Sequence, residues 1–147
     1  MIQLDEIVIQ QMNSDACSGF PNECCGFLFG NEDEAKRTIV AIQPVQNMSK
    51  EDQCRRFSIS AEDYLQAEKY AEENNLSLLG IYHSHPNHPA IPSETDREAA
   101  MPFFSYVIIS VTSNQQCHIR SWRLNQQNQF EEEQSIQFIS TALKLND

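Results

Sequence analysis

Apolar residues with helical spacing occur in two segments of the first half of the chain. The first segment follows Asp5, a residue type that caps helices, and its apolar positions extend from Ile7 to about Ala16. The second follows Ser60, repeats small or apolar residues every three to four positions, and stops before Asn74. The pattern therefore predicts two amphipathic helices, each with a polar N-cap.

Shorter apolar segments have the length and flanking turn residues that are typical of β-strands. They span residues 24–30, 38–45, 76–83, 104–111 and 117–124. Prolines at positions 86, 89 and 92 exclude regular hydrogen bonding, so residues 86–92 are expected to form an ordered loop before a third helix that starts at Ser93. A turn at residues 125–128 and a mixed tail to about residue 145 follow. Strands interleaved with helices predict an α/β or α+β fold.

The composition is typical of one globular domain. The chain has 147 residues, of which 40% are hydrophobic and 21% are charged, and it contains no repeat or linker. We therefore expect a single domain over residues 1–147. No apolar run is long enough to span a membrane, and the start of the chain lacks the features of a signal peptide, so the expected location is cytoplasmic.

Charge and cysteine usage narrow the possible partners. A formal net charge of −11 disfavours binding to nucleic acid or to an anionic membrane, because both require clustered basic residues. The five cysteines are expected to be reduced thiols rather than a disulfide framework. Cys24 and Cys25 are adjacent, so they would point to opposite faces of a strand, and no Cys-x-x-Cys pair exists to bind a metal. A thiol redox role for these two residues is a less favoured alternative.

The segment from His83 to Asp96 combines residue types that bind a transition metal. His83 and His85 are separated by one residue, so in an extended segment both imidazoles face the same side and can reach one ion. Asp96 would lie on the first turn of the third helix, where free amide groups favour a carboxylate. Glu23, at the entrance of the first long strand, supplies a further carboxylate. Imidazoles and a carboxylate suit a catalytic zinc that keeps one position open for water.

Each of these residues also has a purely structural interpretation. A lone His-x-His is about as often a core imidazole followed by a loop residue as it is a metal site. Ser93-x-x-Asp96 has the spacing of a helix capping box, and Ser60-x-x-Asp63 has the same spacing with no histidine nearby. A single glutamate before a strand is typical of a solvated turn. The succession of two histidines, a proline-rich loop and a capped aspartate favours the metal site.

Together, Glu23, His83-Ser84-His85-Pro86 and Ser93-Glu94-Thr95-Asp96 resemble the JAMM motif of the MPN (Mov34/PAD-1) metalloprotease family. The family pattern is a glutamate, then His-Ser/Thr-His, seven residues, Ser, two residues and Asp, and every position is filled in this chain. The segment at residues 21–30 further resembles the first strand region of the short stand-alone prokaryotic members. The resemblance covers the chain from about residue 4 to Leu124.

The resemblance implies a cytidine-deaminase-like three-layer fold, in which helices flank a mixed β-sheet, and a zinc metallopeptidase activity. His83, His85 and Asp96 would be the ligands of one catalytic Zn²⁺ with a bound water. Glu23 would act as the general base and then as the general acid, and Ser93 would donate a hydrogen bond to the oxyanion.

The resemblance also implies a substrate class. Short prokaryotic members are associated with ubiquitin-like or sulfur-carrier proteins, which would be cleaved at a peptide or isopeptide bond at the C-terminal Gly-Gly end. The connection from Asp96 to the strand near Phe104 leaves little room for the insertions of many deubiquitinating enzymes. The alternative is a non-catalytic scaffold module of the same family, which the complete ligand set disfavours.

Overall fold

The computed structural model of the protein describes residues 1–139. The elements are, in chain order, β1 (Ile2–Asp5), α1 (Glu6–Gly19), β2 (Cys25–Glu32), β3 (Arg37–Val45), α2 (Ala61–Glu73), β4 (Ser77–Pro86), α3 (Glu94–Ala99), β5 (Ser105–Val111), β6 (Cys117–Leu124), β7 (Phe130–Glu133) and β8 (Ser135–Phe138). The strands of this part form a mixed sheet in the order β7-β6-β5-β4-β2-β3-β1-β8. The strand β4 lies in the middle, antiparallel to β2 and parallel to β5.

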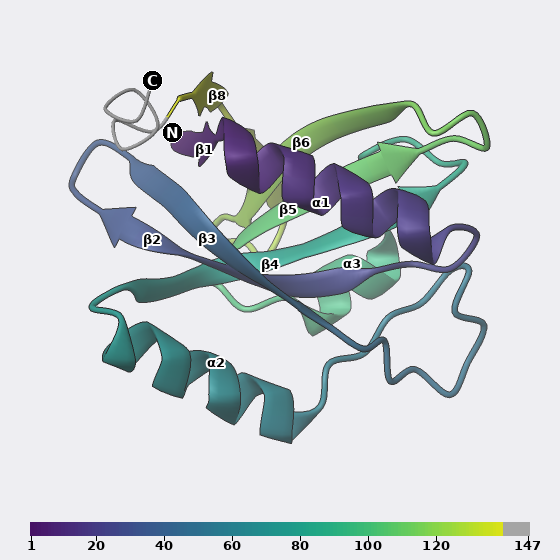
Figure 1. The fold of residues 1–147 in the computed structure, drawn as a ribbon, viewed down its shortest axis with the longest axis horizontal. Coiled ribbons are helices and arrows are strands. Elements are labelled where there is room, and N and C mark those ends of the chain that lie inside the picture. The colour runs from purple at the N-terminus through teal and green to yellow at the C-terminus, as the bar shows by residue number, and fades with distance from the viewer. Residues whose placement is uncertain (140–147) are drawn as a thin grey trace.

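Both faces of the sheet are covered by helices, with α1 on one face and α2 on the other (Figure 1). The packing of strand β2 explains why its apolar residues follow one another without polar residues between them. Leu28 packs in the cluster with the buried side of α1, whereas Phe27 and Phe29 pack in the cluster with α2. A strand that is buried on both faces needs apolar residues at every position. The expected α+β fold, a mixed sheet flanked by helices, is confirmed.

The two edge strands of the sheet are consecutive in the sequence. Glu133 of β7 pairs with Ser121 of β6, and Ser135 of β8 pairs with Ile2 of β1. Only Gln134 separates the two strands, and its carbonyl accepts a hydrogen bond from the Ile2 amide at 2.9 Å. The sheet must therefore curl until one short segment reaches both β6 and β1, whose backbone groups it pairs.

Three of these strands were not expected from the sequence. Strands β1, β7 and β8 are four residues each and are not marked by an apolar run. The acidic segment Glu131–Glu133 pairs with β6, where Glu132 forms an ion pair with Arg120 at 2.7 Å. Short edge strands form because a partner strand lies beside them, and the local sequence does not indicate that partner.

The end of β4 also differs from the expectation. Strand β4 continues to Pro86, which pairs with Val111, so the expected loop at residues 86–92 begins one residue later and both histidines lie in the strand. The half-buried Trp122 holds this loop, because its indole donates to the Ala90 carbonyl at 3.0 Å. The last part of the tail that was expected to reach about residue 145 lies outside the described residues. Within residues 1–139, no helix combines the length and apolarity needed to cross a membrane.

Candidate functional site

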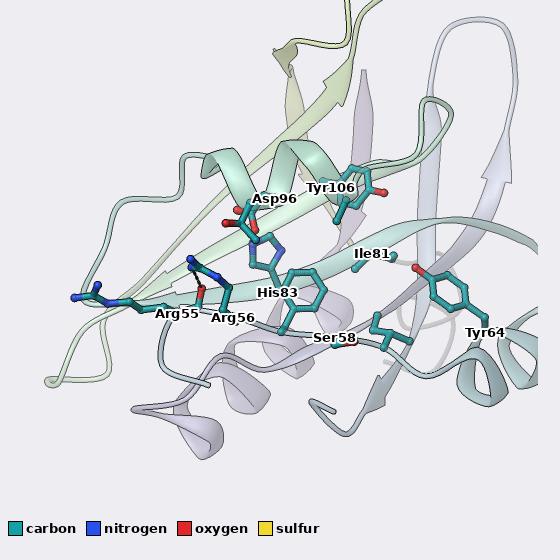
Figure 2. Close-up of a pocket in the computed structure, with 12 residues that line it drawn as sticks. Arg55, Arg56, Ser58, Tyr64, Ile81, His83, Asp96 and Tyr106 are labelled. Atoms are coloured by element: carbon teal, nitrogen blue, oxygen red, sulfur yellow. Dashed lines mark hydrogen bonds and ion pairs between the residues drawn. The ribbon is translucent and has the colours of Figure 1, made fainter. Parts of the chain in front are cut away.

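Three side chains from β4 and α3 converge on one point. The Nε2 atoms of His83 and His85 lie 3.1 Å apart, and Asp96 Oδ2 lies 3.2 Å and 3.1 Å from them. The period of two along β4 places both imidazoles on the same face, and the first turn of α3 brings the carboxylate to them. Figure 2 shows Asp96 beside His83. These three residues form a group that is able to hold a metal ion.

The size and chemistry of this triangle fit zinc. Ligand atoms at the usual zinc distances are separated by about 3.3 Å in a tetrahedral site, close to the spacing of the three atoms. Each of the three atoms carries a free lone pair when the carboxylate is ionised and each neutral imidazole has its proton on Nδ1. Such atoms repel one another at this distance unless a proton or a cation lies between them.

The surroundings of the two histidines orient them as ligands. His85 Nδ1 lies 2.8 Å from the Pro89 carbonyl, which can only accept, so this nitrogen carries the proton and Nε2 keeps its lone pair. His83 is buried, and the Phe57 ring stacks on it with centroids 4.5 Å apart. Burial lowers the pKa of His83, although Asp96 opposes the shift. The neutral imidazole that binds metals is therefore the favoured form of His83.

Asp96 is both a helix cap and a member of the metal group. The Ser93 amide donates to Asp96 Oδ2 at 2.9 Å, and the Asp96 amide donates to Ser93 Oγ at 3.0 Å. The capping box therefore orients the carboxylate toward the imidazoles rather than competing with them. Burial tends to raise the pKa of Asp96, but His83 and His85 outweigh it and hold the pKa well below its usual range.

The hydroxyl of Ser93 is left with a free donor. Its oxygen accepts from the Asp96 amide, so the hydroxyl hydrogen can point elsewhere. Ser93 lines one cavity together with Glu23 and His85. The side chain is therefore placed to donate a hydrogen bond beside the metal group.

Glu23 lies next to the metal group because β2 pairs with β4. The amide of the adjoining residue, Cys24, donates to Ser84 Oγ at 2.8 Å, and the Ser84 amide donates to the Cys24 carbonyl at 3.1 Å. Ser84 stands between the two histidines, so these bonds connect the backbone beside the glutamate directly to the metal-binding strand. Glu23 is 6% exposed, and its Oε1 is buried with no hydrogen-bond partner among the described residues. Such an atom fits a carboxylate that exchanges protons with water or substrate.

Burial also changes the acidity of this carboxyl group. Desolvation raises the pKa of Glu23 from 4.5 to about 8, and the nearby His85 reduces the shift. A carboxyl group with a pKa near neutrality can both take up and release a proton under mild conditions. General acid and base catalysis requires this property.

In protein stripped of metal by a chelator, Glu23→Gln is expected to raise Tm at alkaline pH and to change it little at acidic pH. The pKa of about 8 in the folded state lies above the ordinary value of 4.5. Below a pH of about 4.5 the protonated carboxyl therefore contributes its full stabilisation of the folded state. This contribution is lost as the pH rises through about 8. Glutamine stays neutral, so the variant avoids a decrease in the free energy of unfolding on the order of a few kcal/mol at alkaline pH. Thermal melts of both proteins over this pH window measure the difference; a difference that is constant with pH would contradict the assignment.

A loop that was not expected to be functional forms a wall of the site. Residues 46–59 have no regular pattern in the sequence, yet they carry Arg55, Arg56 and Phe57 to the metal group (Figure 2). The Asn47 side chain holds the loop, because its Nδ2 donates to the carbonyls of Glu23 and Arg56 at 3.1 Å and 2.9 Å. A pair of arginines in a strongly acidic chain was the available signal in the sequence.

Two cavities lie on either side of the metal group, and the two arginines of this loop line both of them. The cavity in Figure 2 extends along His83 and Asp96 to the aromatic side chains of Phe57, Tyr64 and Tyr106. The other contains Glu23, His85 and Ser93, together with His88. The five residues singled out from the sequence therefore line these two neighbouring cavities.

Residues 5–125 match the family described as prokaryotic homologs of the JAB domain. The chain belongs to this family. The resemblance to the JAMM/MPN family is thereby confirmed. This prokaryotic JAB protein is 31% identical over 112 residues to a desampylase of Haloferax volcanii, which covers 76% of this chain and 78% of the relative.

Further relatives agree with this assignment. A desampylase of Pyrococcus furiosus is 31% identical over 110 residues, which is 75% of this chain and 72% of the relative. A probable TtuB-protein conjugate cleaving protease of Thermus thermophilus is 52% identical over 44 residues, 30% of each chain. The solution structure of a protein from Desulfitobacterium hafniense superimposes with a TM-score of 0.85 and 32% identity, covering 95% of this chain and 94% of that one. A second solution structure, from Salinibacter ruber, has a TM-score of 0.72 and 34% identity, covering 92% and 91%.

Proposed function

We propose that this prokaryotic JAB protein is a zinc metallopeptidase that hydrolyses a peptide or isopeptide bond at the C-terminal Gly-Gly end of a ubiquitin-like or sulfur-carrier protein. The observation that carries the proposal is the convergence of His83, His85 and Asp96 beside the buried carboxyl of Glu23. The substrate class is supported by relatives whose names are desampylase and probable TtuB-protein conjugate cleaving protease.

The donor set determines which ion is proposed. Zinc suits two neutral imidazoles and one carboxylate, and three protein ligands leave a position open for chemistry. When bound, zinc would supply Lewis acidity, polarising the scissile carbonyl and lowering the pKa of water. His83, His85 and Asp96 would hold the ion.

Glu23 and Ser93 would perform the proton transfer and the charge stabilisation. The Glu23 carboxylate would take a proton from the attacking water and then give it to the leaving amine. The Ser93 hydroxyl, whose oxygen already accepts from the Asp96 amide, would donate to the carbonyl oxygen as negative charge develops on it. The cavity that Glu23 and Ser93 line together would accommodate the reacting carbonyl group.

Ser93→Ala is expected to lower kcat about 10²-fold with a smaller change in KM, because the lost hydrogen bond forms in the transition state. Ser93 also caps α3, so loss of the cap must be separated from loss of the donor. Ser60→Ala is the matched control, since Ser60 caps α2 in the same way and accepts from the Asp63 amide at 3.0 Å. Equal losses of kcat in both variants would show that Ser93 acts only as a cap.

Product mass provides the direct test of the function. Purified protein is incubated with zinc and with carrier proteins that bear an amino acid, a peptide or a lysine isopeptide after the Gly-Gly end. The expected product is the carrier ending in a free Gly-Gly carboxylate, and Glu23→Gln is expected to form almost none. Zinc-loaded protein that leaves all three adduct types intact would overturn the proposal and favour the non-catalytic scaffold.

A further inference from the structure

Two free thiols from distant parts of the chain face each other in a surface recess. The Sγ atoms of Cys17 and Cys117 lie 4.0 Å apart, although the residues are 100 positions apart in sequence. The recess shares no lining residue with the metal group. We propose that this pair is a redox modification site, at which a disulfide oxidant forms a Cys17–Cys117 bond that ties α1 to β6. The proposal does not depend on the hydrolytic function.

Both sulfur atoms are carried by elements whose positions are already fixed. Cys17 lies on the last turns of α1, next to Ala16, which is fully buried against the sheet. Cys117 is the first residue of β6 and follows a tight turn in which the Thr112 amide donates to the Gln116 carbonyl at 3.1 Å. No segment has to become ordered before the sulfurs meet, so their effective concentration is high. A disulfide needs an S–S distance of about 2.05 Å, so the two sulfur atoms must approach each other by about 2 Å.

The position of the pair makes it more reactive than the other cysteines. Cys17 and Cys117 are half-buried and reach solvent through the recess, whose other lining residues are Asn13, Ser14, Ser18 and Gln115. Burial raises the pKa of Cys24, Cys25 and also Cys117, so acidity does not distinguish the pair; Cys24 and Cys25 are buried, and this burial limits the access of an oxidant to them. Cys54 is half-buried like the pair, but the Sγ–Sγ contact found among the described residues is the one between Cys17 and Cys117. We therefore expect oxidation to select Cys17 and Cys117.

The reaction is an ordinary thiol–disulfide exchange with oxidised glutathione as the probe. One protein thiolate attacks the glutathione disulfide, forms a mixed disulfide and releases one glutathione. The second thiolate then attacks the protein sulfur of the mixed disulfide and releases the second glutathione. The two protein thiols lose two protons and two electrons, and the glutathione disulfide gains both.

The disulfide would stabilise the folded state by reducing the conformational entropy of the unfolded chain. It closes a loop of 100 residue steps, and long closed loops lose the most conformational freedom in the unfolded state. The expected increase in Tm is roughly 5–15 °C. The helix end that would be fixed precedes Glu23 by only a few residues, so oxidation also fixes the backbone that leads to the site.

The test treats the full chain with oxidised glutathione at mildly alkaline pH and follows intact mass, disulfide mapping and Tm. We expect a loss of two hydrogen atoms without a glutathione adduct, a bond that maps to Cys17–Cys117, and a higher Tm that a reductant reverses. Cys17→Ser and Cys117→Ser should each keep a glutathione adduct and show no increase in Tm. Both remove a half-buried sulfur, and melts of the reduced variants verify that they fold.

Cys54→Ser is the matched control and should oxidise as the unmodified chain does. A bond that maps to another pair, or thiols that stay free or carry glutathione in the unmodified chain, would overturn the proposed site. A Cys17–Cys117 bond that leaves Tm unchanged would overturn its role in tying α1 to β6.

Discussion

Replacing Glu23 with glutamine is expected to lower kcat by about 10²–10⁴-fold while zinc content and substrate binding change little. Glutamine matches the neutral glutamic acid in shape, so it fits the same buried position beside the metal group. It cannot take a proton from water or return it to the leaving amine. The buried Oε1, which has no hydrogen-bond partner within residues 1–139, and the pKa raised to about 8 support the proposed role of Glu23 over that of an exposed carboxylate. Steady-state kinetics together with metal analysis measure the effect.

The control for this variant is Glu94→Gln. Glu94 lies on the first turn of α3 near the site, but its side chain is 67% exposed and forms an ion pair with Arg97. It should retain the kcat of the unmodified protein. If Glu23→Gln were as active as Glu94→Gln, another group would have to be the base.

Asp96→Asn is expected to weaken zinc binding by at least about 10²-fold and to reduce hydrolysis to background. Groups that only orient metal ligands already contribute roughly 10–100-fold to affinity, so loss of a charged ligand costs at least as much. The asparagine oxygen can still accept from the Ser93 amide, so the cap of α3 is retained. Competition with a chromogenic chelator measures the affinity, and metal analysis gives the zinc content per chain.

Asp63→Asn is the matched control for the ligand variant. Ser60-x-x-Asp63 repeats the spacing of Ser93-x-x-Asp96 at the start of α2, away from the metal group. This variant should bind zinc and hydrolyse substrate as the unmodified protein does. If both variants lost zinc to the same extent, the effect would come from helix capping rather than from ligation.

The ligand residues were predictable because their geometry is local. One residue between His83 and His85 places both imidazoles on one face of any extended segment. The Ser93-x-x-Asp96 spacing likewise places a carboxylate on the first turn of a helix, whatever the helix packs against. The structure shows that the capping box and the metal group are not alternatives, since one carboxylate oxygen serves both.

Other contributions to the site could not be predicted because they depend on contacts between distant segments. Glu23 was identified through its family pattern, and only the bonds between Cys24 and Ser84 bring it to the histidines. Phe57 covers His83, and Asn47 holds the loop that carries it, through contacts that no period or spacing in the sequence encodes. A polar loop has no regular pattern of its own, so its hydrogen bonds depend on what the sheet places beside it.

The sequence by itself determined the central strands, the three helices and the candidate metal donors, and the resemblance of its motif gave the family. The strands, the helices and the candidate donors follow from apolar periodicity, capping residues and short spacings, which act within a few residues along the chain. Only the tertiary structure decided the closure of the sheet through Gln134, the position of Glu23 beside the metal group, and the approach of Cys17 to Cys117. Each of these results from strand register and packing between segments that are far apart in the sequence, and such pairings are selected by the whole fold rather than by local preference.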